Sequence, residues 1–173
     1  MGSVMIVRLS KAALTASVGA FALLVGADNV IDGGTNFAFV QHVLSMDTTF
    51  PGNALLGRAI TSEWAHRAAF ALIIASELAV GFLCMLGAWR LFAARARSAS
   101  QFNAAKGPAV AGLAAGFALY FFGFLVVGGE WFQMWQSQTW NGQAAAFRFA
   151  ASFGLVLIFV NQEDTDHGHD RRR

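Results

Sequence analysis

Charged side chains are scarce in this chain. Only 13% of its 173 residues are Asp, Glu, Lys or Arg, whereas 56% are hydrophobic. A soluble domain carries about 25% charged residues. The mean hydropathy of +0.51 and the content of 17 Phe and 18 Gly are typical of closely packed membrane helices. The composition therefore excludes an ordinary soluble domain and predicts an all-α integral membrane protein.

Cysteine and known catalytic motifs are nearly or wholly missing. The single cysteine, Cys84, cannot form an intrachain disulfide, and we interpret it as a small core residue within an apolar run. The sequence has no phosphate-binding glycine loop, nucleophile elbow, Cys-rich metal motif or nucleotide fingerprint. Its polar segments are too short for a soluble catalytic domain. We therefore expect neither an enzyme nor a resident cofactor.

Long apolar runs dominate what is present. Four of them reach about the 20 residues needed to cross the hydrocarbon core of a bilayer. These runs are residues 12–31, 67–89, 108–129 and 143–160. They predict a four-helix transmembrane bundle within a membrane domain of residues 1–161, followed by a disordered polar cytoplasmic tail at 162–173.

Basic residues gather beside one end of the predicted spans. With the N-terminus inside, the cytoplasmic segments hold most of the 12 Lys and Arg residues, namely Arg8, Lys11, Arg90, Arg95, Arg97, Lys106 and Arg171 to Arg173. The positive-inside rule then places both termini in the cytoplasm. Because these residues flank spans instead of forming one soluble face, we expect the lipid bilayer as partner and no nucleic acid.

A polar stretch, "FVQHVLSMDTTFPGN" at residues 39–53, separates the first two spans. The apolar positions Phe37, Val40 and Leu44 recur at helical spacing, and the Pro51-Gly52-Asn53 turn signal follows. This pattern predicts a short amphipathic helix near residues 36–46. Its apolar side chains would face the membrane or the bundle.

Glu77 is the sharpest single candidate for chemistry, because it lies near the middle of the second span. A charge at that depth costs at least about 2.5–3.5 kcal/mol, so the side chain should face the interior and be protonated or paired. Counting to the middle of the other spans predicts a shared polar layer with Ser17, Tyr120 and Ser152. Glu77 is then either a proton or ligand site, or a neutral carboxyl group that joins helices.

Other polar and small residues suggest further contacts. Arg148, about one turn inside the fourth span, is predicted to pair with Glu130 at the end of the third span. Gly112 and Gly116 form a G-x-x-x-G face for close packing, either within the bundle or against a partner chain.

Histidine and methionine in the outer segments form a weak metal pattern. His42 and Met46 are neighbours on one helical face, and His66 or Met134 would complete a soft copper site. The alternative interpretation is a histidine hydrogen-bonded to Asp47 or Glu63, without metal.

Two segments carry a family resemblance. "NFAFVQHVLSMDTTFPGNALLGRAITS" and "GGEWFQMWQSQTWNGQAAAFRF" resemble the signature regions of predicted small integral membrane proteins of bacteria, the domain of unknown function 2165. The resemblance spans nearly the whole chain. It implies a four-span inner-membrane protein and brings no catalytic residues with it.

The leading interpretation of function is a non-catalytic accessory or scaffolding subunit of a larger inner-membrane complex, a respiratory one included. Its support is the lack of a complete catalytic set and outer segments rich in Trp, Phe and Met, which are favoured in interface cores. The alternatives are a small transporter or proton-linked carrier that uses Glu77, or a membrane protein that binds a quinone, a lipid or copper.

Overall fold

The computed structural model describes residues 2–165 of the chain. In chain order its helical segments are α1 (Gly2–Ile31), α2 (Gly34–Ser45), η1 (Leu56–Arg58), α3 (Glu63–Ala94), α4 (Ala99–Ala104), α5 (Gly107–Ala118), η2 (Leu119–Trp131), η3 (Met134–Gln136) and α6 (Gln143–Asn161). Four helices of this described part are long and apolar enough to cross a membrane: α1, α3, the continuous α5–η2 helix and α6. The predicted four-helix transmembrane bundle is confirmed, and α1 and α3 extend beyond the predicted spans.

Helix boundaries follow local signals in the sequence. Ser62 is the N-cap of α3, and Glu63 in the first turn suits the positive end of the helix dipole. Pro108 begins the first turn of α5, where its missing N–H costs nothing. At the end of α2, Met46 adopts a left-handed conformation with φ 52°, and its N–H donates to the Val43 carbonyl.

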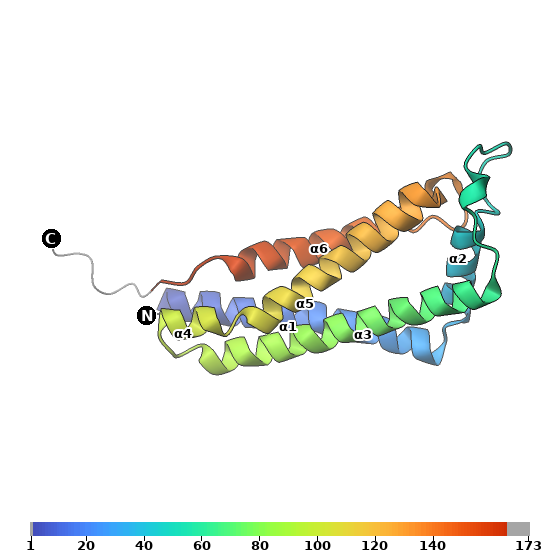
Figure 1. The fold of residues 1–173 in the computed structure, drawn as a ribbon. Helices are drawn as coiled ribbons and strands as arrows, with labels where there is room; N and C mark the ends of the chain where they lie inside the picture. The colour runs from blue at the N-terminus through green and yellow to red at the C-terminus, as the bar shows by residue number, and fades with distance from the viewer. Residues whose placement is uncertain (1, 166–173) are drawn as a thin grey trace.

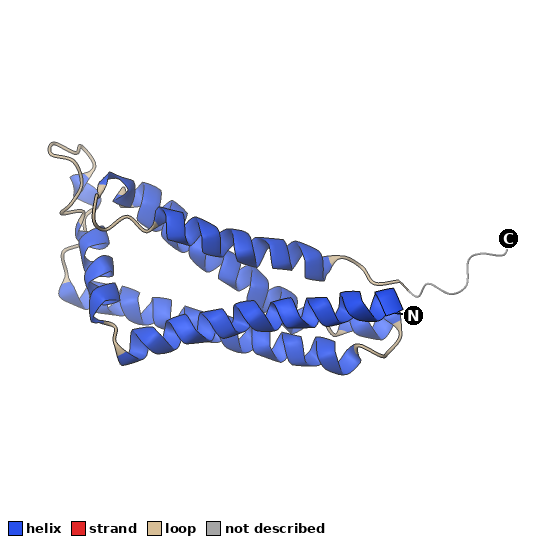
Figure 2. Cartoon of the chain, turned by 180° about the vertical axis from the view of Figure 1, so that it is seen from behind, coloured by secondary structure: helices blue, strands red, loops and turns tan. Residues whose placement is uncertain are grey.

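The bundle is V-shaped (Figure 1). α1 packs against α3, and α5–η2 packs against α6. The two pairs lie close together at the end that holds the N-terminus and α4, here called the terminal end. They diverge toward the other end, here called the α2 end, where α2 crosses from one pair to the other (Figures 1 and 2).

Small residues allow the close approach where the pairs meet. A Cβ on Gly112 of α5 would lie 2.8 Å from Cys84 Sγ of α3, and one on Gly116 would overlap the Phe153 ring of α6. The predicted G-x-x-x-G face therefore packs within the bundle. Cys84 itself is fully buried in the core, as the sequence indicated.

The amphipathic helix is confirmed as α2. Val40 is buried, Leu44 packs against a cluster that includes Val43 and Phe132, and Phe37 meets Phe70 of α3 with ring centroids 5.7 Å apart. The apolar side of α2 therefore faces the bundle and bridges the two diverging helix pairs.

Buried charges join three segments at the terminal end. The Asp164 carboxylate accepts from Lys11 Nζ at 2.6 Å and lies 2.8 Å from Lys106 Nζ, and Arg8 Nε is 3.6 Å away. Both lysines also donate to the Gln162 carbonyl. The first residues of the predicted tail therefore pack against the bundle, because these cations attract them. Residues 166–173 of that tail lie outside the described residues.

Candidate functional site

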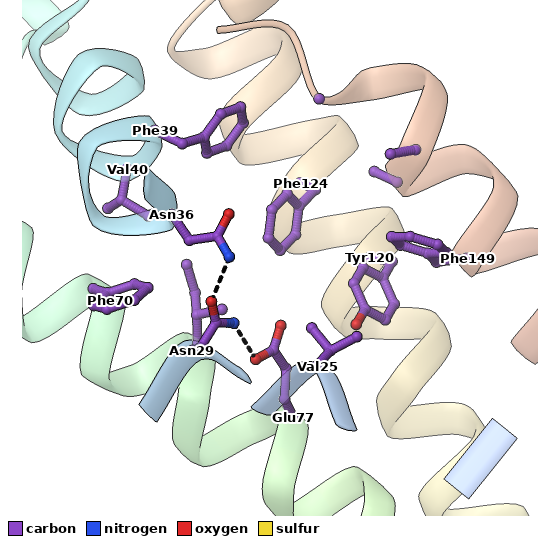
Figure 3. Close-up of a pocket in the computed structure, with 14 residues that line it drawn as sticks. Val25, Asn29, Asn36, Phe39, Val40, Phe70, Glu77, Tyr120, Phe124 and Phe149 are labelled. Carbon is purple, nitrogen blue, oxygen red and sulfur yellow. Dashed lines mark hydrogen bonds between the residues drawn. The ribbon is translucent and has the colours of Figure 1, made fainter. Parts of the chain in front are cut away.

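A cavity of about 200 Å³ lies where the two helix pairs diverge beneath α2. Most of its wall is apolar, with aromatic rings from several elements. Those rings belong to Phe39 of α2, Phe70 of α3, Phe124 of η2 and Phe149 of α6 (Figure 3). Polar groups enter this wall at Asn29, Asn36, Glu77 and Tyr120. The cavity is therefore a largely apolar chamber with a few polar groups, which is typical of small-molecule sites.

A ladder of hydrogen bonds crosses three helices on one side of the cavity (Figure 3). Asn36 of α2 donates its amide N–H to Asn29 Oδ1 of α1 at 2.6 Å. Asn29 Nδ2 in turn donates to Glu77 Oε2 of α3 at 2.9 Å. Glu77 has a relative exposure of 2%, so this amide replaces part of the hydration that the carboxyl group loses.

The turn between α1 and α2 makes this ladder possible. Gly33 separates the two helices, and a Cβ there would overlap the Asn29 carbonyl oxygen and lie 3.0 Å from carbon atoms of the Phe70 ring. A larger residue would push the turn away from α3. Glycine therefore lets α2 fold back so that Asn36 reaches Asn29.

Tyr120 faces Glu77 from the opposite helix pair (Figure 3). Its relative exposure is 3%, and its ring packs among Phe21, Phe124 and Phe149. Within the described part of the chain its hydroxyl has no hydrogen-bond partner. Tyr120 lies one residue after the backbone changes from α-helical to π-helical hydrogen bonding, a rare geometry that often occurs at functional sites. The cavity thus holds an unpaired hydroxyl opposite a partly paired carboxyl group.

The predicted polar layer is wrong for two of its members. Ser17 and Ser152 are exposed on their helices, and each hydroxyl donates to the carbonyl four residues earlier, Ala13 and Arg148 respectively. A serine in an apolar helix satisfies itself in this way without a partner on another helix. Equal depth in the sequence therefore identified Tyr120, which faces Glu77, but failed for the two serines.

Sequence reasoning missed Asn29 because the α1–α3 register was unknown. Gly26 lies against Leu78, and Gly81 against Leu23, so the end of α1 is level with the middle of α3. That register places Asn29 beside Glu77, although Asn29 ends its own span. The available signal was a pair of asparagines, one on each side of the turn after the first span, in a chain whose second span contains a carboxyl group.

The predicted outer ion pair is also wrong. Glu130 and Arg148 are both exposed, and among residues 2–165 no ion pair joins them. The face of α6 that packs inward carries Ala146, Ala150 and Phe153 instead. Arg148 lies on an exposed side of the helix.

The candidate metal ligands have other partners. His42 Nδ1 lies 2.8 Å from the Asp47 carboxylate, and the ring stacks on Trp140 with centroids 4.7 Å apart. His66 Nε2 contacts the Ile60 carbonyl at 2.7 Å.

The sulfur-containing candidates, Met46 and Met134, are buried with Val43 and Phe132. No group of three His, Cys, Asp or Glu residues suited to a metal ion occurs in the part of the chain that the structure describes. His42 and one ring nitrogen of His66 have local partners, whereas the buried His66 Nδ1 has none among the described residues.

A second cavity, of about 180 Å³, adjoins the first. Phe39, Val40, Ile73 and Phe124 line both cavities. The second is almost wholly apolar and ends against Leu72 of α3, which is 68% exposed. The second cavity therefore lies between the first cavity and the surface of α3 and η2 that lipid would cover.

The family comparison agrees with the fold. The model of a family described as predicted small integral membrane proteins, of unknown function, matches residues 7–163. Searches with the chain found no matching curated protein and no matching solved structure.

Proposed function

Because this chain belongs to the family of predicted small integral membrane proteins of unknown function, we propose a role that its fold can support inside a bilayer. It is a non-catalytic, proton-linked carrier that holds a small amphiphilic molecule in the cavity beneath α2. Glu77 is the polar anchor of the ligand and accepts a proton when the cavity is empty.

The observation that carries this proposal is the incomplete pairing of Glu77. An ionised carboxylate offers about four acceptor positions, and the described residues supply it with one hydrogen bond, from Asn29. An unpaired charge at membrane depth is costly. The carboxyl group therefore needs a proton or a ligand, and the cavity gives a ligand room to reach it.

The access route supports a ligand that comes from the membrane. The second cavity reaches the outer surface at Leu72, which an apolar molecule dissolved in lipid would meet directly. The described side chains lining the first cavity supply one carboxyl group, two amides, one hydroxyl and aromatic rings, with no thiol or imidazole. That set holds no nucleophile with an adjacent base, so it suits binding better than nucleophilic catalysis.

A cavity-blocking variant tests this proposal. Ala145 lines the first cavity, whereas its neighbour Ala144 is exposed. We expect native mass spectrometry of protein released from lipid nanodiscs to detect a bound small molecule in wild type and in Ala144→Phe, and to lose it in Ala145→Phe. Identical bound molecules in all three proteins would contradict the proposal.

An accessory subunit of an inner-membrane complex is the second candidate. At the α2 end, outside the spans, Phe50 and Trp135 are 52% and 44% exposed and meet edge to face at 5.9 Å. Exposed aromatic pairs of this kind often anchor interfaces. If this role holds, replacing both residues by Ala should release partner subunits that co-purify with wild type in mild detergent. A monomer that purifies without partners in wild type would contradict it.

A further inference from the structure

We propose that the ligand is a cationic amphiphile, whose protonated amine pairs with Glu77 and whose apolar tail extends into the second cavity. This inference rests on the proposed function and specifies the class of molecule carried.

The polar end of the chamber has acceptors in excess of cations. Glu77 and Tyr120 are the titratable groups among the described residues that line the first cavity, and α1, α2 and α6 contribute amide or apolar side chains there. No Lys, Arg or His from the described chain lines it. A carboxylate or phosphate head group would therefore find no cation among the described lining residues, and an ionised Glu77 would repel it.

An ammonium group meets the requirements of this site. Its N–H groups can donate to Glu77 and to the Tyr120 hydroxyl oxygen, two groups that face each other across the cavity (Figure 3). The faces of aromatic rings such as Phe124 and Phe149 attract a cation, and the attraction is stronger for a desolvated cation. The charge of the amine replaces the proton that the buried carboxyl group otherwise needs.

The tail has a separate place in the second cavity. Its walls include Leu44, Leu119 and Val127, and it shares Phe39 and Phe124 with the first cavity. A dry cavity of about 150 Å³ is known to hold a molecule the size of benzene. Cavities of about 200 and 180 Å³ therefore suit an amine with a short alkyl or aryl chain.

The proton and the ammonium group compete for the same carboxylate, that of Glu77, so binding of one releases the other. Ammonium binding then displaces the proton from Glu77, and protonation of Glu77 releases the amine. Lower pH therefore weakens amine binding and leaves the binding of a neutral analogue unchanged.

The test measures scintillation proximity binding of tritiated octylamine and of tritiated 1-octanol to the protein in nanodiscs. Partition of each probe into the lipid is the same for every variant, so differences between variants report the site. Glu77→Gln should weaken octylamine binding by about tenfold or more, as expected when a buried charge loses its partner. Octanol binding should stay unchanged. The matched control is Glu63→Gln, which alters an exposed carboxylate on the same helix.

Two further variants keep the test decisive. Tyr120→Phe should weaken octylamine binding severalfold, and it remains informative if Glu77→Gln does not fold. Gly123→Leu should fill the second cavity, because a Cβ there would meet only the Leu119 side chain, at 3.9 Å. It should weaken octylamine binding more than binding of the shorter butylamine.

The possible failures are distinguishable. If octanol binds as tightly as octylamine and Glu77→Gln changes neither affinity, the ligand is not selected for its positive charge. The proposal that the cavity binds a ligand would still hold. If Ala145→Phe leaves the binding of every probe unchanged, the cavity is not a binding site, and the proposed function falls with this inference.

Discussion

Asn29 joins three helices through one amide group. It accepts from Asn36 of α2 and donates to Glu77 of α3. Asn29→Ala would leave the buried Glu77 carboxyl group without this donor, at roughly 1–3 kcal/mol for the unsatisfied group, whereas the exposed Asn36 amide can bond to water. We expect the thermal unfolding midpoint in nanodiscs to fall clearly.

Ser17→Ala is the matched control on the same helix, since its exposed hydroxyl contacts only its own backbone. It should change stability by less than about 0.5 kcal/mol. If both variants lowered the unfolding midpoint equally, the hydrogen bonds of Asn29 would not stabilise the fold more than the Ser17 hydroxyl does.

Two replacements of Glu77 distinguish the contribution of its shape to stability from the contribution of its hydrogen bond. Glu77→Gln keeps an acceptor for the Asn29 amide, so the fold should tolerate it. Glu77→Leu removes that acceptor and should lower the free energy of unfolding by about 1–3 kcal/mol. A leucine variant as stable as the glutamine variant, measured by reversible unfolding in detergent mixtures, would contradict this ranking.

The sequence identified single residues of the site more reliably than the residues on other helices that contact them. Glu77 stood out because a carboxyl group within an apolar run must be buried or paired, and Tyr120 does face it. Ser17 and Ser152 were wrong because a helix can satisfy its own hydroxyl groups. Asn29 and Asn36 depended on helix register and on the fold of one turn, which no single span encodes.

At the scale of elements, α2 was predictable and its role was not. Its apolar spacing indicated an amphipathic helix, but the same spacing fits a helix lying on lipid. The structure places Val40 and Leu44 against the bundle, because the diverging helix pairs leave apolar surface there that α2 covers. The helix therefore forms the roof of the cavity.

The segment after α6 also has a structural role. Burial alone would raise the pKa of Asp164, but hydrogen bonds from Lys106 and Lys11 hold it below its ordinary value of 3.8. A carboxyl group with a lowered folded-state pKa stabilises the fold above its unfolded-state pKa. That contribution is lost as the pH falls through the lower, folded-state pKa.

Asp164→Asn should therefore destabilise the bundle most at neutral pH. Removing one partner of a buried charge cluster costs about 3–5 kcal/mol. The difference from wild type should shrink as the pH falls from about 5 toward 2, because the wild-type carboxylate is then protonated. Unfolding midpoints across this range measure it, with Glu163→Gln, an exposed neighbour, as control. A difference that does not change with pH would contradict an ionised Asp164.

At the scale of the whole molecule, the V shape explains why a small bundle contains a chamber. Glycine and alanine contacts hold the helices close near the terminal end, where Gly87 lies against Ala109. Large rings such as Phe39, Phe70 and Phe124 occupy the α2 end. The sequence showed both residue types, but the opening angle depends on how all four spanning helices pack together.

The two ends of the molecule differ in charge, and this difference predicts its orientation. The basic residues of the described chain at the terminal end are Arg8, Lys11, Arg90, Arg95, Arg97 and Lys106, whereas those at the α2 end are fewer and include Arg58 and Arg67. Basic segments remain in the cytoplasm during insertion. The terminal end should therefore face the cytoplasm, and the α2 end should face outward.

Cysteine labelling on intact spheroplasts tests this orientation. Ala54 and Ala96 are exposed at opposite ends of the molecule, and the native Cys84 is fully buried, so it should not react in the folded protein. An impermeant thiol reagent should label Ala54→Cys before lysis and Ala96→Cys only after it. The reverse pattern would place α2 and the cavity roof in the cytoplasm. A carrier in that orientation would have its chamber nearer the cytoplasmic face, so the direction of proton and ligand exchange would also be reversed.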